Sequence, residues 1–193
     1  MELNITHQEK YSRGELLLRS ILGIFYIVFP HMFVLMFAQL WGAILGFIAF
    51  WVVLFTGKYP ESMFEYQVGL LRWNLRLNAT LYNLTDGYPS FGVNGSSDTV
   101  KLDVPYPEKI SRGLVLLRLF FGVFYVAIPH ILFIYVRMIW GALLSFLAFW
   151  AVLFTGKYPA SFHAFQVGTF RWLYRVNLYL RYMTDDYPPF SSK

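Results

Sequence analysis

Residues 41–60 read WGAILGFIAFWVVLFTGKYP, and residues 140–159 read WGALLSFLAFWAVLFTGKYP. The same offset of 99 pairs residues 1–91 with residues 100–190 without a gap, and 44 of the 91 pairs are identical. A match of this length indicates that one unit has been duplicated. Between the copies, residues 92–99 (GVNGSSDT) have the small, polar composition of a flexible linker, and residues 191–193 form a tail.

The composition favours a membrane environment over water. Of the 193 residues, 57% are hydrophobic and 21% aromatic, whereas only 14% are charged. Soluble domains rarely carry so little charge, while aromatic rings suit both the hydrocarbon of a bilayer and its interfaces. The chain has no cysteine, which excludes disulfides and thiolate chemistry. These features predict an all-α integral membrane protein.

A long uncharged stretch forms the apolar part of each repeat. No charged residue occurs between Arg19 and Lys58, and the matching stretch of the second repeat contains only Arg137. Because a helix needs about 20 apolar residues to cross a bilayer, this length predicts two crossings joined by a turn near Ala38 or Arg137. We expect four transmembrane helices in total, as hairpins at residues 15–57 and 114–156.

The motif Thr-Gly-Lys-Tyr-Pro ends each apolar stretch. Gly57 suits the left-handed C-cap of a helix, and Pro60 suits the start of the next one. Lys58 and Lys157 are placed to complement the helix end and to contact lipid headgroups. Third helices are therefore predicted at residues 60–84 and 159–183.

Each third helix is predicted to be amphipathic, with a cationic stripe. Arg72 and Arg76 lie one turn apart on one face, as do Arg171 and Arg175 in the second repeat. Two arginines at mid-length make a further crossing expensive, so we expect these helices to lie in the membrane interface. The four arginines and the two lysines named above are candidates for binding anionic lipid headgroups or a partner.

The opposite side of the same helices carries amides. Gln67 and Asn78 lie there in the first repeat, and Gln166 and Asn177 in the second. An amide without a partner in hydrocarbon is unfavourable. We therefore expect this amide stripe to hydrogen-bond to the hairpin and to hold the third helix against its own repeat.

Short alternating runs occur at the start of both repeats, at residues 3–5 (LNI) and 102–104 (LDV). The pattern is compatible with two short strands. An isolated pair of strands is marginally stable, but one strand from each repeat would join the halves by pairing.

The basic residues indicate an orientation. Fifteen of the sixteen Lys and Arg residues lie before, between or after the two long apolar stretches, residues 20–57 and 119–156, and Arg137 is the exception. The positive-inside rule then places both termini, the linker and both amphipathic helices in the cytosol. An even number of crossings per repeat also predicts that the two repeats are parallel.

Pro30-His31 and Pro129-His130 occupy equivalent places within the apolar stretches. An ionisable group inside a bilayer is a functional candidate, here for proton relay or ligand binding. The alternative, which we favour, is structural: proline kinks the helix and frees a carbonyl, and the imidazole satisfies a local backbone group. Two histidines without nearby carboxylates or cysteines make a poor metal site, and we predict neither a metal nor a cofactor.

The motifs of each repeat together resemble a known family. In order they are LFTGKYP, Gln-Val-Gly, Arg-Trp-x-x-Arg and Thr-Asp-x-Tyr-Pro-x-Phe, and all occur twice. The combination is similar to a bacterial membrane-protein family known only as a domain of unknown function. The resemblance covers nearly the whole chain and implies a location in the bacterial inner membrane, but no activity. The first copy departs from the family pattern at Ser90, where the second has Pro189.

The sequence contains no nucleophile elbow, phosphate loop, paired carboxylates or dinucleotide motif, which predicts that the protein is not an enzyme. It also has no separate basic domain for nucleic acid. We therefore expect an accessory or scaffold subunit of a larger membrane complex, with membrane lipids and other subunits as partners. The alternatives are a lipid-handling protein that uses its cationic helices, and a channel or proton pathway at the Pro-His kinks.

Overall fold

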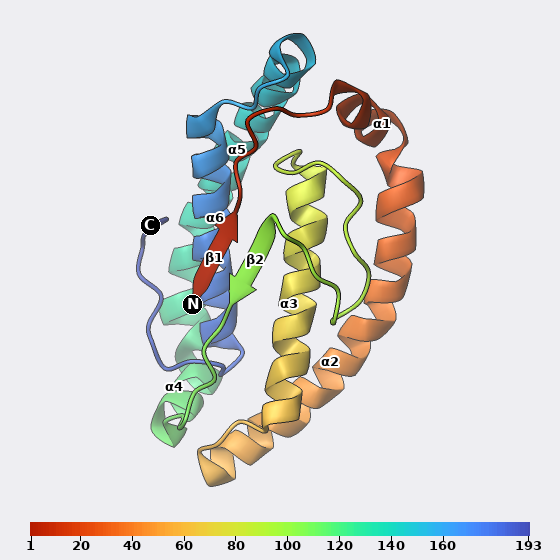
Figure 1. Cartoon of the computed structure of the whole chain (residues 1–193). Helices are drawn as coiled ribbons and strands as arrows, with labels where there is room; N and C mark the ends of the chain where they lie inside the picture. Colours follow the sequence, from red (N-terminus) through yellow and green to blue (C-terminus); the bar gives the residue numbers. More distant parts are fainter.

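Each half of the protein contains a long bent helix. In the computed structural model, which describes residues 1–193, α1 (Arg13–Gly23), the π-helical turn η1 (Ile24–Val28) and α2 (Phe29–Thr56) follow one another without a break (Figure 1). The second half repeats this order with α4 (Arg112–Gly122), η2 (Val123–Ala127) and α5 (Ile128–Thr155). The segments Arg13–Thr56 and Arg112–Thr155 are both long and apolar enough to cross a membrane.

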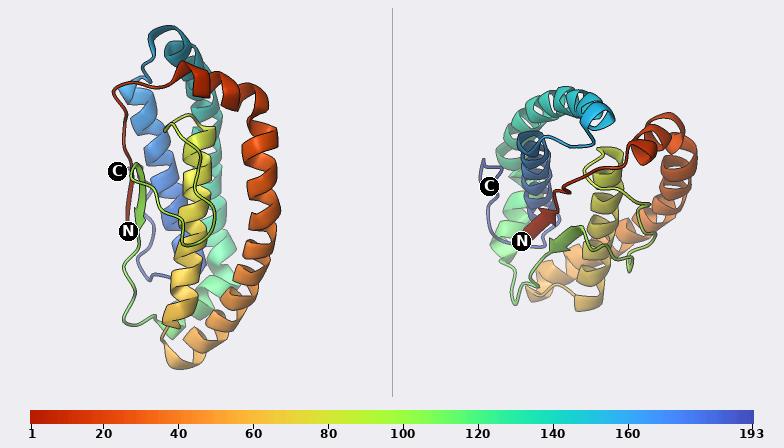
Figure 2. Two further views of the ribbon diagram at one scale, coloured as in Figure 1. Left: turned by 45° about the vertical axis from the view of Figure 1, so that its right-hand side comes forward. Right: turned by 45° about the horizontal axis from the view of Figure 1, so that its top comes forward.

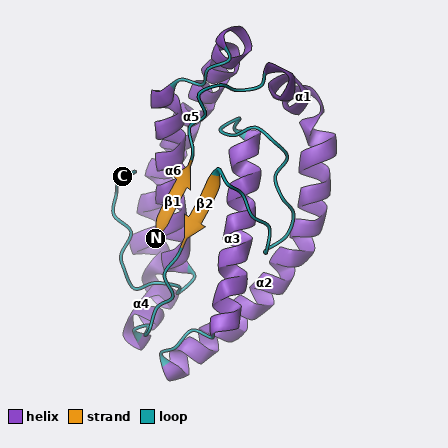
Figure 3. Ribbon diagram, in the orientation of Figure 1, coloured by secondary structure: helices purple, strands orange, loops and turns teal.

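A shorter helix follows each long one. These helices are α3 (Glu61–Leu81) and α6 (Ala160–Leu180), while β1 (Glu2–Ile5) and β2 (Val100–Asp103) form the only sheet (Figure 3). Gly57 ends α2 in the left-handed conformation, with φ of 72°, and Pro60 is the N-cap of α3. The prediction of a mainly helical chain in two similar halves, with a short strand at the start of each, is confirmed.

The predicted hairpins are wrong. α2 runs through Ala38 and α5 runs through Arg137, so each apolar stretch forms one long helix instead of two crossings. The residues around Ala38, FAQLW at 37–41, include no glycine or proline that would end a helix. Arg137 stays within its helix because its guanidinium donates to the Thr169 hydroxyl and to the Phe165 carbonyl of α6, at 3.2 Å each.

The two halves are antiparallel, so the prediction of parallel repeats is also wrong. At one end of the molecule the start of α1 meets the end of α5, where Arg13 donates to the Phe154 carbonyl at 2.9 Å. At the other end Ile110, just before α4, donates to the Gly57 carbonyl at 2.8 Å. Each half contains one long helix, and residues 82–111 lead the chain back to the end of α2 (Figure 1). The second long helix therefore begins where the first one ends and runs in the opposite direction.

The strand pair lies on the approximate two-fold axis between the halves. Leu3 pairs with Leu102, its own equivalent in the second copy, and the register is antiparallel. Antiparallel pairing of two equivalent strands implies a two-fold rotation, and the same rotation relates the reversed long helices. The predicted joining of the halves by one strand from each repeat is therefore confirmed.

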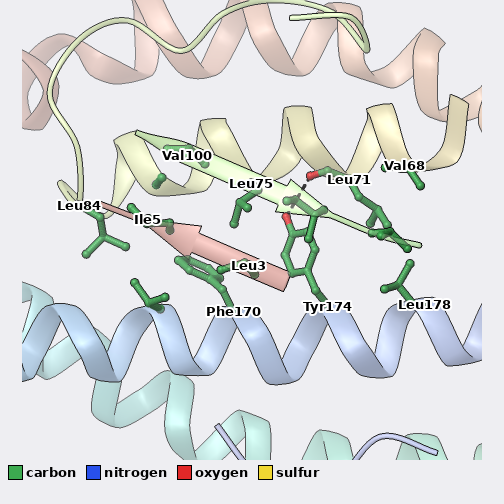
Figure 4. Packing of buried hydrophobic residues seen from close by; sticks show 14 of the residues in the cluster. Leu3, Ile5, Val68, Leu71, Leu75, Leu84, Val100, Phe170, Tyr174 and Leu178 are labelled. Atoms are coloured by element: carbon green, nitrogen blue, oxygen red, sulfur yellow. Dashed lines mark hydrogen bonds between the residues drawn. The ribbon is translucent and has the colours of Figure 1, made fainter. Parts of the chain in front are cut away.

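The helices α3 and α6 lie inside the molecule, between the long helices and the sheet (Figure 2). Twelve of the 21 residues of α3 are buried. Leu71 and Leu75 of α3 and Phe170 and Tyr174 of α6 form one core with Leu3 and other strand residues (Figure 4). These helices are thus not the surface helices expected, because the strands and the segments that follow each helix cover their charged face.

Candidate functional site

Three motifs that are far apart in the sequence meet in the first half. The indole N–H of Trp73, on α3, donates to Nδ1 of His31, on α2, at 2.9 Å. The ring of Phe91, in the segment after α3, stacks on the imidazole with the ring centres 3.8 Å apart. These contacts bury His31 completely. We call His31, Trp73, Tyr88 and Phe91 the first motif cluster.

The second motif cluster consists of the equivalent residues His130, Trp172, Tyr187 and Phe190. Trp172 donates to His130 Nδ1 at 2.9 Å, and Phe190 stacks on the imidazole at 3.9 Å. The histidines were predicted from the sequence as candidate site residues, whereas their tryptophan partners were not. A signal was present, because the tryptophan follows the histidine by 42 residues in both repeats.

A tyrosine of each motif cluster satisfies the carbonyl that proline leaves open. Pro30 has no N–H, so it cannot bond to the carbonyl of Tyr26 four residues earlier. The Tyr88 hydroxyl donates to that carbonyl at 3.0 Å, and Tyr187 donates to the Tyr125 carbonyl at 3.0 Å in the second half. The structural interpretation gave this role to the imidazole, and a tyrosine performs it instead. Each π-helical turn lies directly before the kink.

The two motif clusters differ at one nitrogen. Because the indole donates to Nδ1, the proton of each neutral imidazole is on Nε2. Nε2 of His130 lies 3.2 Å from the Tyr187 hydroxyl, whereas Nε2 of His31 has no partner. Aromatic side chains enclose both rings, so the clusters hold the kinks in place and present no exposed nitrogen. No group of His, Asp or Glu side chains in the chain is arranged to hold a metal ion.

A buried ion pair ties the end of each half to its first helix. Arg118 is 4% exposed; it pairs with Asp185 and donates to two backbone carbonyls near the end of α6. In the first half Arg19 pairs with Asp86 at 3.0 Å. From the sequence, these arginines contributed only to the predicted orientation of the chain. Their recurrence at equivalent positions, beside an apolar stretch, was the signal of a structural role.

The cationic stripe of α3 and α6 faces the backbone of the protein itself. Arg72 donates to the Leu102 carbonyl of β2 at 2.9 Å, and Arg171 donates to the Leu3 carbonyl of β1 at 3.1 Å. Arg76 is 3% exposed and donates to two carbonyls of the segment after α3. These three arginines therefore fasten the strands and the closing segments to the helices.

The other predicted cations are not brought together. Arg175 borders a hollow of about 160 Å³ that Met1 and Asp186 also line. Lys58 and Lys157 are exposed at opposite ends of the molecule, since the halves are antiparallel. Their contact with lipid stays a prediction.

Two glutamines of the amide stripe link the third helices to the long helices. Gln67 donates to the Gly42 carbonyl at 2.5 Å, and Gln166 donates to the Gly141 carbonyl at 2.6 Å. In the second half, glycine leaves room for this approach, because a Cβ at Gly141 would lie 2.8 Å from Gln166 Oε1. The glutamines thus make the contacts expected of the stripe.

The asparagines of the stripe instead line a central cavity of about 580 Å³ between α2, α3 and α6. Asn78 donates to a carbonyl of its own helix, and Oδ1 of Asn177 has no partner. Arg181 also lines the cavity; it donates to Gln67 Oε1 at 2.8 Å and forms no salt bridge. The central cavity therefore has a cation without a matching carboxylate.

The position of Arg181 explains its electrostatics. The side chain is exposed to the open cavity, and the protein atoms around it partly desolvate the guanidinium. Burial lowers the pKa of Arg181 and raises the pKa of Tyr59, on the same cavity wall, to about 12. At neutral pH the wall presents a guanidinium and a neutral phenol. The sequence reasoning missed Arg181; the available signal was Tyr82 at the equivalent position of the first repeat.

Fold and clusters together define a class: a duplicated, mainly helical protein with two long apolar helices, in which both halves are closed by the same His-Trp-Tyr-Phe contacts. The chain belongs to the family described as a domain of unknown function, DUF4389, whose model matches residues 13–92 and again residues 112–192. The resemblance seen in the repeated motifs is thereby confirmed, with two tandem copies. The comparison with curated proteins and the comparison with solved structures each gave no match.

Proposed function

We propose that the protein is a non-enzymatic, membrane-embedded protein of the bacterial inner membrane that binds lipid, and that the central cavity holds the headgroup of an anionic lipid. The observation that carries this proposal is Arg181, an exposed guanidinium on the wall of the central cavity that has no carboxylate partner. A guanidinium without an acidic partner can form charge-assisted hydrogen bonds to a bound anion.

The dimensions and chemistry of the central cavity suit such a headgroup. Its volume of about 580 Å³ lies within the usual range for ligand sites, about 300–1,000 Å³. Arg181 and the Tyr59 hydroxyl are donors for a phosphate or carboxylate. Gly42 and Gly46 limit the side chains on the α2 wall to those of Gln39 and Ala43, which leaves room for the acyl chains to reach the membrane.

Most of the other candidate polar groups already form hydrogen bonds within the protein, which favours the central cavity as the lipid site. Three of the four arginines predicted to bind lipid, Arg72, Arg76 and Arg171, donate to backbone carbonyls. The histidines that suggested a proton pathway accept hydrogen bonds from tryptophans and are stacked on phenylalanines. We therefore prefer the central cavity over both.

Native mass spectrometry of the purified chain tests the proposal. After delipidation, phosphatidylglycerol is added to the wild type, to Arg181→Leu and to Arg72→Leu, which removes a cation outside the cavity. We expect the Arg181→Leu variant to lose the bound lipid, while the Arg72→Leu variant and the conservative Arg181→Lys variant retain it. Equal retention by all variants would overturn the proposal. Parallel samples with phosphatidylcholine or inorganic phosphate distinguish an anionic lipid from a free anion.

A second candidate is the accessory subunit expected from the sequence. It is favoured by the exposed aromatic side chains on the long helices, such as Phe47 and Trp51 on α2 and Phe146 and Trp150 on α5. Apolar helix faces of this kind are available for contact with other membrane proteins as well as lipid. Purification in mild detergent should then recover a stoichiometric partner, and a chain that repeatedly purifies alone would count against this role.

A further inference from the structure

The apolar surface of the protein is concentrated on the two long helices. Nineteen exposed large apolar side chains lie on Arg13–Thr56 and twenty-one on Arg112–Thr155, whereas only six lie elsewhere. An exposed apolar surface of this extent marks contact with a membrane or with protein. Its distribution therefore indicates which side of the molecule meets hydrocarbon.

The opposite side of the molecule is polar and lies beside the middle of the inner helices. Arg72, midway along α3, bonds to β2, and Arg171, midway along α6, bonds to β1. The strands expose Glu2, Lys101 and Asp103. Figure 2 shows the sheet and both chain termini on one side of the molecule, away from α2.

The basic residues are divided between the two ends of the molecule. One end carries Arg13 and Lys10, next to the end of α5, where Tyr11 bonds to the Gly156 carbonyl. The antiparallel arrangement places the equivalent Arg112 and Lys109 at the other end. Each long helix also ends in an exposed lysine, Lys58 or Lys157. Both ends therefore carry exposed basic residues, which differs from the one-sided distribution of a spanning protein.

A spanning orientation conflicts with these positions. With the long helices along the membrane normal, the charged strand residues would lie near mid-depth of the bilayer, where ionised side chains are expensive. α2 alone has 28 residues, which corresponds to about 42 Å, against a hydrocarbon thickness of about 30 Å. Arrangement along the membrane plane avoids both conflicts.

We propose that the protein lies in a single leaflet, with α2 and α5 parallel to the membrane plane, their apolar faces in the acyl chains and the strand pair toward water. The surface that the long helices present is thus a docking surface for a lipid leaflet. The cations at both ends then lie at headgroup depth, where anionic lipids attract them. The approximate two-fold axis runs along the membrane normal. This placement holds whether or not the central cavity binds lipid.

Cysteine accessibility distinguishes the two orientations, because the chain has no cysteine of its own. Lys10→Cys and Lys109→Cys place thiols at equivalent exposed positions at opposite ends. A membrane-impermeant maleimide is added to intact spheroplasts and, separately, to lysed cells. In each of these two conditions we expect both variants to be labelled to the same extent. The exposed strand variant Lys101→Cys should follow the same pattern. Labelling of one end in spheroplasts with protection of the other would overturn the proposal.

Depth measurements give a second test that does not depend on labelling yield. Nitroxides attached at Ile24→Cys, Phe37→Cys and Phe55→Cys, all exposed positions along one long helix, are compared in vesicles of phosphatidylglycerol and phosphatidylethanolamine. We expect the three probes to share one shallow depth. A deeper middle probe between two shallow end probes would show that the helix crosses the bilayer, and would overturn the proposal.

Discussion

The motif clusters and the central cavity use polar side chains in opposite ways. In the clusters, which occur once in each repeat, nearly every polar atom has a partner within the protein. In the cavity, Arg181 has no acidic partner and Asn177 Oδ1 has none at all. Arg181 is also a residue at which the two repeats differ. The repeated motifs therefore maintain the fold, whereas a binding site is expected at positions where the two copies differ.

The largest effect is expected at the buried ion pair of the repeated unit. Arg118→Leu leaves Asp185 and two backbone carbonyls without their partner and should lower stability by about 3–5 kcal/mol. Thermal unfolding in detergent measures this, and Arg19→Leu should show a similar loss in the first half. Melting temperatures equal to that of the wild type for both variants would show that these repeated ion pairs do not maintain the fold.

A smaller effect is expected at His163, where the repeats differ but the side chain is buried. Burial, reinforced by the nearby His7, lowers the pKa of His163 to about 4. Between about pH 6.5 and 4 the unfolded chain binds a proton that the folded chain does not, so stability should fall by up to about 3 kcal/mol as the pH decreases through this window. His163→Phe, which introduces the residue that the first repeat has at the equivalent Phe64, should weaken this pH dependence. Unchanged melting curves at pH 7 and pH 4.5 for both proteins would contradict the prediction.

The two tyrosines at the proline kinks should differ in a smaller but measurable way. Tyr187→Phe removes the hydroxyl that contacts both the Tyr125 carbonyl and His130, whereas Tyr88→Phe removes only the bond to the Tyr26 carbonyl. We expect losses of about 2 and about 1 kcal/mol respectively. Denaturation of the two variants side by side measures the difference, and a larger loss for Tyr88→Phe would reverse the order.

The smallest effect on stability is expected in the central cavity. Arg181→Tyr introduces the residue of the first repeat and removes a cation that has one hydrogen bond to Gln67. The free energy of unfolding should change by no more than about 1 kcal/mol relative to the wild type. The variant should nevertheless lose the bound lipid. A loss as large as that of Arg118→Leu would mean that Arg181 belongs to the structural set, and the contrast between clusters and cavity would fail.

Much of the local structure could be predicted from the sequence. The glycine in Thr-Gly-Lys-Tyr-Pro marked the ends of α2 and α5, because only a residue that tolerates positive φ suits that cap. The strand from each repeat was visible as a short alternating run. The family and the duplication followed from the repeated motifs.

The long-range arrangement could not be predicted in the same way. Length alone suggested that the uncharged stretch would fold into two crossings, but the residues around Ala38 contain no turn signal, and one continuous helix formed. The direction of the second copy then depended on where residues 82–111 end, which no local pattern encodes. The cavity depended in turn on that direction, since it brings Arg181 of one half to Gln67 of the other.

The pairing of Leu3 with Leu102 has a consequence for assembly. Because these are the same residue of two copies, a single copy already carries a surface that is complementary to itself. Two separate single-copy chains could therefore associate as a symmetric dimer through this strand. The linker at residues 92–99 converts that encounter into an intramolecular one, so pairing no longer depends on protein concentration. Covalent linkage also frees the two copies to diverge, which a dimer of identical chains cannot do.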